Sequence, residues 1–145
     1  LRTIPKPIRR IFIHGYQSWI FNLALSKYLE EKVECDKIKF LGEKLAFPKK
    51  KVDIEDVKCL IPGTNMRLRK DKFSDNLKEL LRKDDIKIDD FRVKRMPELA
   101  SEGALREPFI KISNLRISDN IKLKFNLSKG SYATIVLMWL FKQEA

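Results

Sequence analysis

A short stretch near the carboxyl end, Lys129-Gly130-Ser131, has the composition of a phosphate-binding turn. It lies between a strand-like and a helix-like segment. Amides at a helix N-terminus favour anions, Gly permits close approach, and Lys adds charge. The stretch lacks the spacing of a Walker loop, G-x-x-x-x-G-K-[ST]. The alternative is that Ser131 caps the helix while Gly130 forms a turn, and the spacing alone favours this cap.

His14 is the only histidine in the chain and belongs to the segment HGYQSWIFN. His14, Ser18, Asn22 and Ser26 stand four residues apart, so on a helix they form one polar ridge, with Gln17 beside it. Neutral polar side chains of this kind can hydrogen-bond to backbone groups nearby. Without a candidate nucleophile or a second histidine close by, we interpret His14 as a structural histidine rather than a catalytic base.

Other chemistry-bearing residues are sparse. Four aspartates flank expected turns and look like surface capping groups rather than a buried acid–base pair: Asp84, Asp85, Asp89 and Asp90. Cys35 and Cys59 form no CxxC pair, and with a single histidine they do not make a zinc site. We expect two free thiols and no metal, with a disulfide as the open alternative.

Positive charge dominates the composition. The chain of 145 residues has 31 Lys and Arg against 20 Asp and Glu, a formal net charge of +11. Such an excess attracts polyanions, so nucleic acid is the first expected partner and an acidic membrane surface the second; the alternative is lysine that merely solubilises the surface. Two clusters are either RNA-facing or simply solvated loops: Arg67, Arg69, Lys70 and Lys72, and Arg92, Lys94, Arg95 and Arg106.

The apolar pattern predicts an α+β protein. Helical spacing predicts a long, mostly buried helix from Ile8 to about Glu31, and a second helix with Ser74 as its N-cap. Alternation and turn signals predict strands over 37–47 (two strands around Leu41-Gly42), 57–61, 109–117 and 121–127, with a turn at 118–120. A short helix or turn is expected at Asp89-Asp90 and a final helix over 132–142. No run approaches the roughly 18 residues of a membrane span, and no signal peptide is visible.

Several stretches resemble the TruD-type tRNA pseudouridine synthases, particularly the archaeal and eukaryotic branch. IFIHGYQSWIFNLALSKYL looks like the long helix of that family, and CLIPGTNMRL resembles its strand-to-turn segment with a Leu-Pro-Gly core. FRVKRMPELASEGALREPFI, followed by KFNLSKGSYATIVL, resembles its Pro-Glu segment and its terminal GSYAT motif. The order and spacing also fit, and the resemblance covers nearly the whole chain.

The resemblance implies an inserted, family-specific domain over 1–117, followed over 118–145 by the C-terminal strand and helix of the synthase core. It implies a cytoplasmic enzyme that needs no metal or organic cofactor and isomerises a D-arm uridine of tRNA, position 13 in tRNA numbering, in a basic cleft between the two parts. The base must leave its stack, at a cost of roughly a few kcal/mol. The residues expected to line this cleft or bind RNA are Lys129, Gly130, Ser131, Tyr132, Thr134, Arg106, Arg95, Arg67 and Arg69.

The chain departs from the family pattern in two places. The catalytic aspartate of the family lies in an upstream Lys-Asp-Arg-like motif, followed by Asn-x-Phe-Gly, and neither motif is present here. No aspartate of this chain therefore inherits the catalytic role. The family usually has Arg-Glu a few residues after GSYAT, where this chain has Met138 and Trp139.

Three functions fit the sequence. The first is the C-terminal part of a tRNA pseudouridine synthase, inactive alone and dependent on an upstream catalytic half; the absence of an initial Met favours a processed or partial chain. The second is a catalytically dead module that grips structured RNA. The third is a protein-interaction domain whose exposed apolar patch consists of Met138, Trp139 and Phe141.

Overall fold

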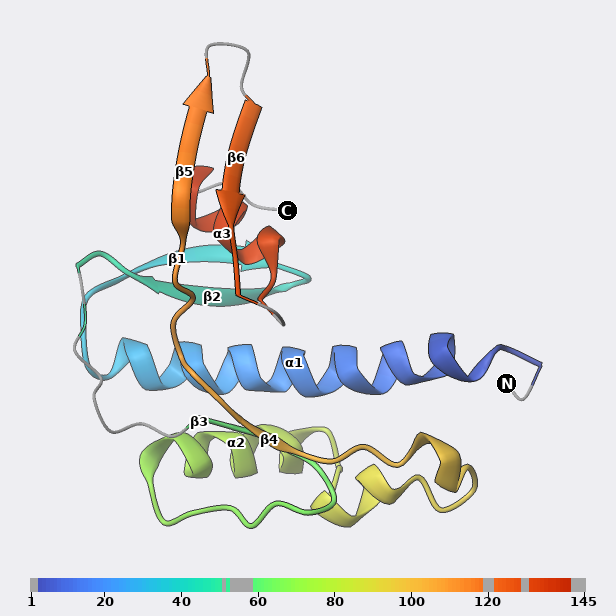
Figure 1. Ribbon diagram of the computed structural model, residues 1–145. Helices are drawn as coiled ribbons and strands as arrows, with labels where there is room; N and C mark the ends of the chain where they lie inside the picture. Colours follow the sequence, from blue (N-terminus) through green and yellow to red (C-terminus); the bar gives the residue numbers. More distant parts are fainter. Residues whose placement is uncertain (1–2, 51, 53–58, 119–121, 129–130, 142–145) are drawn as a thin grey trace.

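The computed structural model describes residues 3–50, 52, 59–118, 122–128 and 131–141. A long helix runs through the middle of the molecule, with a second helix on one side of it and a β-hairpin on the other (Figure 1). A second hairpin and the last helix lie beyond the first hairpin (Figure 1). The elements are α1 (Lys6–Glu30), β1 (Cys35–Phe40), β2 (Glu43–Pro48), β3 (Cys59–Ile61), α2 (Lys72–Lys83), the 3-10 turns η1 (Ile88–Arg92) and η2 (Pro97–Leu99), β4 (Ala104–Arg106), β5 (Ser113–Ser118), β6 (Lys122–Asn126) and α3 (Ala133–Phe141). The predicted α+β class is confirmed.

Helix α1 is confirmed, and it passes through Gly15 without interruption. It begins directly after Pro5, whose fixed φ suits a helix start. The prediction that it is mostly buried is wrong for the first half, where Ile8, Ile11 and Phe12 are 46%, 64% and 68% exposed. The core residues of α1 all lie in its second half, where they pack with α2 and β3.

The main core lies where the second half of α1 crosses α2. Phe21 of α1 and Phe73 of α2 are both buried, and their ring centroids lie 5.7 Å apart in a tilted arrangement, which aromatic pairs prefer. Leu77 of α2 and Ala24 of α1 are fully inaccessible to solvent. A second cluster on the other side of α1 joins the β1–β2 hairpin to α3. Helix α1 therefore has a separate core on each side.

The N-cap of α2 differs from the prediction. Helix α2 begins at Lys72, and the side chain of Asp71 accepts a hydrogen bond of 2.8 Å from the backbone N–H of Ser74. Ser74 itself lies inside the first turn, where it is buried and its Oγ accepts from the N–H of Arg69. Asp and Ser are both good caps, and the chain enters the helix three residues earlier than the Ser alone suggests.

The polar ridge of α1 forms hydrogen bonds, as expected, but not through His14. Gln17 is buried; its amide N–H donates to the carbonyl of Pro62 at 2.7 Å, and its Oε1 accepts from the hydroxyl of Ser101 at 2.9 Å. On the same helix, Ser26 Oγ accepts from the N–H of Ala46 at 3.0 Å. His14 is exposed, so it lies outside this buried part of the ridge, and its interpretation as a structural rather than catalytic histidine stays a prediction. The hydrogen-bonding part of the ridge begins one helical turn later.

The strands form three separate two-stranded antiparallel sheets: β1–β2, β3–β4 and β5–β6. Strand β4 was not among the predicted strands. The β1–β2 turn is the predicted Leu41-Gly42, and both residues have positive φ, as a two-residue hairpin of the primed type requires. Strand β5 begins at Ser113, later than the predicted 109. In β6, Leu123 and Phe125 are half-buried while Lys122 and Lys124 are exposed, which confirms the alternation.

Some predicted boundaries lie outside the described residues. These are the start of the strand before 59, the centre of the turn at 118–120, residue 121 and residue 142. The expected domain boundary at 117/118 falls within β5, which pairs with β6 on the other side of it, and the division stays a prediction. Among the described residues, no helix combines the length and apolar character needed to cross a membrane.

A close backbone contact fixes the loops that follow β3 and precede β4. A Cβ built on Gly63 would collide with the backbone of Glu102 and Gly103, and one built on Gly103 would collide with the carbonyl of Ile61. A Cβ on Gly15 of α1 meets nothing within 4 Å. Gly63 and Gly103 are therefore required by space, whereas Gly15 is not.

We predict opposite effects of alanine at these glycines. Gly63→Ala forces two backbone segments apart, so the free energy of unfolding should fall by about 3 kcal/mol. Gly15→Ala, the control, should raise it by about 0.5–1 kcal/mol because alanine is the better helix former. Urea denaturation of the two variants measures both changes. Equal stability of Gly63→Ala and the unmodified chain would show that the loops do not touch as described.

The two cysteines are free, as expected, and differ in environment. Cys59 on β3 is fully buried, and burial, with a smaller contribution from the charge of Asp71, raises the pKa of its thiol to about 12. Because the pKa in an unfolded chain is about 8.5, the unfolded state loses this proton first as pH rises. The thiol therefore stabilises the fold below about pH 8.5 and loses that contribution towards pH 12.

We predict that a Cys35→Ala variant, which leaves Cys59 as its one thiol, reacts slowly with a thiol reagent up to pH 10. In urea, the same thiol should react with a midpoint near its ordinary value of about 8.5, since the thiolate is the reacting species. The measurement is the labelling rate against pH, with and without urea. A native-state midpoint near 8.5 would contradict the burial of Cys59.

Candidate nucleic-acid interface

Tyr132 lies directly before the first residue of α3 and connects that helix to α1. Its hydroxyl and the hydroxyl of Ser18 are 2.9 Å apart and share a hydrogen bond. Tyr132 is 45% exposed, so the ring is held at its tip while much of it faces solvent. Ser18 belongs to the polar ridge of α1, and this contact gives it a partner far away in the chain. A fixed, exposed aromatic ring is a suitable surface for stacking.

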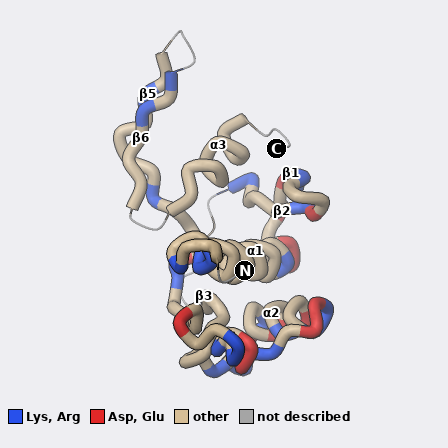
Figure 2. Tube along the Cα trace, turned by 90° about the vertical axis from the view of Figure 1, so that its right-hand side faces the viewer, with Lys and Arg blue, Asp and Glu red and all other residues tan. Residues whose placement is uncertain are grey.

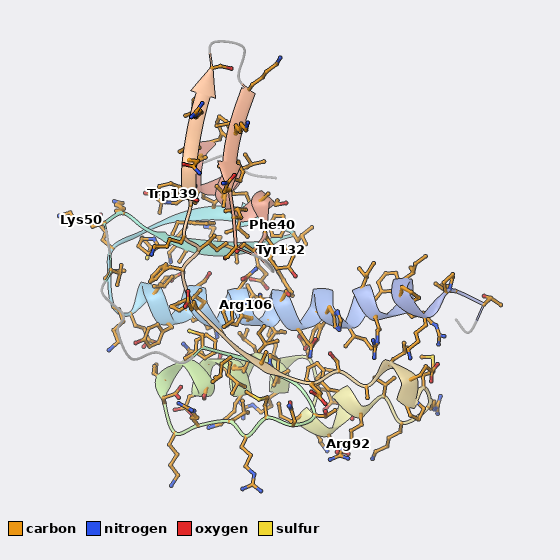
Figure 3. The ribbon with its side chains drawn as sticks, viewed as in Figure 1. Phe40, Lys50, Arg92, Arg106, Tyr132 and Trp139 are labelled. Carbon is orange, nitrogen blue, oxygen red and sulfur yellow. The ribbon has the colours of Figure 1, made fainter. Side chains whose placement is uncertain are left out.

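Arg106 at the end of β4 lies between two aromatic rings. Its guanidinium carbon is 5.2 Å from the ring centroid of Phe21 and 5.7 Å from that of Tyr132 (Figure 3). Both distances are within the range of a cation–π interaction. Phe21 is buried in the main core, so Arg106 links that core to the start of α3. Sequence reasoning missed this arrangement, because its three members come from distant segments.

The predicted phosphate turn is only partly described. Lys129 and Gly130 lie outside the described residues. Ser131 donates its backbone N–H to the carbonyl of Ser128 at 3.1 Å, and the two serine hydroxyls are 2.9 Å apart. Because α3 begins at Ala133, the residue before it is Tyr132, so the prediction that Ser131 caps this helix is wrong. Thr134, in the first turn of α3, is exposed.

The two predicted basic clusters differ in the structure. Arg67 and Arg69 are exposed on the loop before α2, as expected. Arg92 and Lys94 both pair with Asp89, which reduces the charge of the second cluster. Arg92, the last residue of η1, lies away from Arg106, which is level with α1 in this view (Figure 3).

The second cluster therefore lacks Arg106. Arg106 is the last residue of β4 and lies opposite Cys59 of β3, and this pairing places it towards α1 rather than towards η1. Arg95 is exposed and remains on the η1 side of the molecule. The four cations are close together in the sequence, but the pairing of β3 with β4 separates Arg106 from the other three.

The apolar patch predicted around α3 is only partly exposed. Trp139 and Phe141 are 46% and 47% exposed, but Met138 is buried against Ile38 and Leu45 of the β1–β2 hairpin. On a helix, neighbouring residues point in different directions, so one of the three faces the hairpin while the others face away. The inclusion of Met138 in an exposed patch is therefore wrong.

Of the four aspartates that were expected to be capping groups, Asp90 caps a turn and Asp84 has a different partner. Asp90 accepts a hydrogen bond of 2.7 Å from the backbone N–H of Lys87 and so caps η1. Asp84 accepts a hydrogen bond of 2.9 Å from the hydroxyl of Tyr16, and burial together with this bond raises the pKa of Tyr16. Within the described part of the chain, no group of three or more His, Cys, Asp and Glu residues is placed to hold a metal ion.

The family model for tRNA pseudouridine synthase D (TruD) matches residues 1–139. The chain belongs to this family. A relative from Nanoarchaeum equitans, named "Probable tRNA pseudouridine synthase D", is 36% identical over 97% of this chain and 35% of its own length. The tRNA pseudouridine synthase D of Aquifex aeolicus is 33% identical over 96% of this chain and 38% of its own length.

The fold agrees with that assignment. A crystal structure of tRNA pseudouridine synthase D (TruD) from Methanosarcina mazei is similar to this chain with a TM-score of 0.63 and 26% identity, over 99% of this chain and 40% of that one. The chain thus spans between about one third and two fifths of the length of these TruD relatives. The resemblance inferred from the helix and GSYAT motifs is confirmed.

We predict that Arg106 contributes to stability through its two rings. Arg106→Ala removes both cation–π contacts, and the free energy of unfolding should fall by about 1–2 kcal/mol. Arg67→Ala, which changes an exposed arginine on the loop before α2, is the control and should change it by less than about 0.5 kcal/mol. Chemical denaturation followed by tyrosine and tryptophan fluorescence gives both values. Equal effects of the two changes would show that the rings do not hold Arg106.

Proposed function

We propose that this chain acts as the C-terminal portion of a tRNA pseudouridine synthase, which isomerises a uridine of tRNA to pseudouridine. The observation that carries the proposal is the TruD match over residues 1–139, which includes the GSYAT motif. The motif residue Tyr132 is fixed against α1 by Ser18 and Arg106, so the motif has a defined position on the body of the chain. The target within tRNA is the D-arm uridine at position 13.

The residues present indicate which part of the enzyme this chain supplies and which part comes from upstream. The catalytic aspartate comes from an upstream half of the enzyme, because no aspartate of this chain occupies the family motif. Residues 1–117 form the inserted domain, and 118–145 complete the synthase core. No metal and no organic cofactor takes part. The enzyme acts in the cytoplasm, where tRNA is its substrate.

The side chains of this chain bind and orient the RNA. Exposed Arg67, Arg69 and Arg95 offer positive charge to phosphates, a contact that strengthens binding without reading sequence. Tyr132 and Arg106, with Ser131 and Thr134 beside them, line the cleft where the uridine leaves its stack. Lys129 and Gly130, which directly precede Ser131 in the sequence, are proposed to bind RNA with it. Stacking and charge offset the cost of extracting the base.

A second candidate function is RNA binding without catalysis. Met138 stands where the family usually has the arginine of its Arg-Glu pair, and it is buried in the cluster with Ile38 and Leu45. A charged side chain at this position would have to leave that cluster. Met138 therefore takes part in the packing between α3 and the β1–β2 hairpin. The chain keeps the residues that are proposed to bind RNA but lacks the positive charge of the family's usual arginine.

The test is a chimera in which this chain replaces the matching segment of the Nanoarchaeum equitans relative, which supplies the upstream half. We predict that the 145-residue chain alone forms no pseudouridine in a tRNA transcript, whereas the chimera forms it at position 13. The readout is carbodiimide labelling followed by primer extension. The relative with its own segment is the positive control.

The two candidates give different results in this experiment. A chimera that binds tRNA but forms no pseudouridine contradicts the enzyme proposal for this chain. If the double change Met138→Arg and Trp139→Glu then restores activity, the loss lies in that pair and the non-catalytic RNA-binding function is correct. A chimera that folds but does not bind tRNA contradicts both candidates.

A further inference from the structure

The β5–β6 hairpin is a ribbon with two unlike faces. In an antiparallel pair, directly opposite residues point to the same side, and the side alternates along the strand. The opposite pairs are Arg116 with Lys124, Ile117 with Leu123, and Ser118 with Lys122. Arg116, Lys122 and Lys124 therefore share one side of the ribbon, which we call the cationic face. Ile117 and Leu123 point to the other side.

The cationic face contains an unfavourable contact. Arg116 and Lys124 are directly opposite each other, and like charges in this position destabilise a sheet. Lys122 adds a third positive charge on the same side. A local arrangement that opposes folding is expected where function requires it. The hairpin therefore carries a feature that its own stability does not explain.

The charges of the cationic face are not neutralised by the described residues. No described carboxylate forms an ion pair with Arg116, Lys122 or Lys124. Elsewhere, ion pairs are frequent: the described ones include Lys27–Glu79, Lys78–Asp75 and Lys83–Glu43. Figure 2 shows the same contrast, since blue and red segments mix around α2, whereas the described part of β5 and β6 shows blue alone.

The other hairpin shows that like-charge pairing alone is not sufficient for this inference. In β1–β2, Lys39 lies directly opposite Lys44. That hairpin also carries Glu43, which pairs with Lys83, and Lys37, which pairs with Glu30. Its positive charge is therefore balanced locally. This difference makes β1–β2 a matched control for β5–β6.

We propose that the cationic face of β5–β6, formed by Arg116, Lys122 and Lys124, binds the phosphate backbone of RNA. Lys122 and Lys124 are two residues apart on one strand, so they stand about 7 Å apart along the ribbon, which suits neighbouring phosphates. A protein that neutralises phosphates with Lys and Arg releases counterions and gains affinity. The proposal rests on the proposed function for the identity of the RNA as tRNA.

The arrangement of the faces favours RNA over an acidic membrane. A segment that lies on a membrane inserts its apolar side while its cations reach the headgroups around it. Here the exposed Ile117 and the half-buried Leu123 point directly away from the cations. If the apolar side entered a membrane, the cationic face would point away from it. RNA needs only the cationic face, and leaves the apolar side free for packing against protein.

The test reverses one charge. Lys124→Glu places a carboxylate opposite Arg116, so cross-strand attraction replaces repulsion and the melting temperature of the 145-residue chain should stay equal or rise. Binding of a tRNA transcript should weaken about tenfold at 100 mM salt, and the log–log slope of affinity against salt should become less steep by about 1–2. Lys44→Glu makes the same change of net charge opposite Lys39 and should leave both tRNA quantities within about twofold of the unmodified chain.

Fluorescence anisotropy across a salt series, with a melting curve for each variant, distinguishes the outcomes. Weaker tRNA binding by Lys124→Glu alone, without loss of stability, supports the cationic face. Equal weakening by both variants shows that only net charge matters and overturns the proposal, as does no weakening by either. If Lys124→Glu lowers the melting temperature, the second variant is Lys122→Gln, which removes one charge from the same face. A salt slope less steep than that of the unmodified chain then supports the proposal, and an unchanged slope overturns it.

Failure of this proposal is distinct from failure of the proposed function. If Lys124→Glu binds tRNA normally and the chimera with the upstream half forms pseudouridine, the enzyme proposal stands and the cationic face is excluded. If the unmodified chain binds vesicles of phosphatidylserine and phosphatidylcholine but no tRNA, the hairpin proposal is overturned in favour of a membrane surface. The enzyme proposal is then decided by the chimera alone.

Discussion

The buried amide of Gln17 is the interaction on which the arrangement of this chain depends. From the middle of α1, it donates to the carbonyl of Pro62 after β3 and accepts from the hydroxyl of Ser101 before β4. A buried amide left without partners costs about 1–3 kcal/mol, so the helix and both loops favour one relative position. That position orients β4, and β4 carries Arg106 to the ring of Tyr132. One polar side chain thus connects the core to the candidate RNA interface.

Much of the fold could be predicted because its signals are local. The long helix, the Leu41-Gly42 turn and the alternation of β6 all depend on residues close together in the chain. The start of α2 was misplaced because Asp71 and Ser74 are both good caps, and only the path of the chain decides between them. The first half of α1 was predicted to be buried but is exposed. An apolar helix face does not indicate whether other residues of the same chain pack against it.

The candidate site was predicted less well, because it is built from long-range contacts. Ser18 and Tyr132 are 114 residues apart in the sequence, and their types alone do not indicate that they meet. Arg106 was grouped with the cations near η1 because they are close in the chain, although its pairing with Cys59 of β3 and its contacts with Phe21 and Tyr132 place it beside α1. The family motif identified the right segment, while its partners were visible only in the fold.

The contact between Gly63 and Gly103 also constrains how this chain can diverge. When a large residue in a core is replaced, a change in its neighbour can restore the packing volume. No such compensation exists here, because a Cβ on Gly63 would meet backbone atoms of Glu102 and Gly103, and one on Gly103 would meet the carbonyl of Ile61, and no substitution removes backbone atoms. Neither glycine can therefore be replaced together with a compensating change in a neighbour. A larger residue would fit only if both loops followed a different path. Gly15, which touches nothing, is free to vary without any change elsewhere.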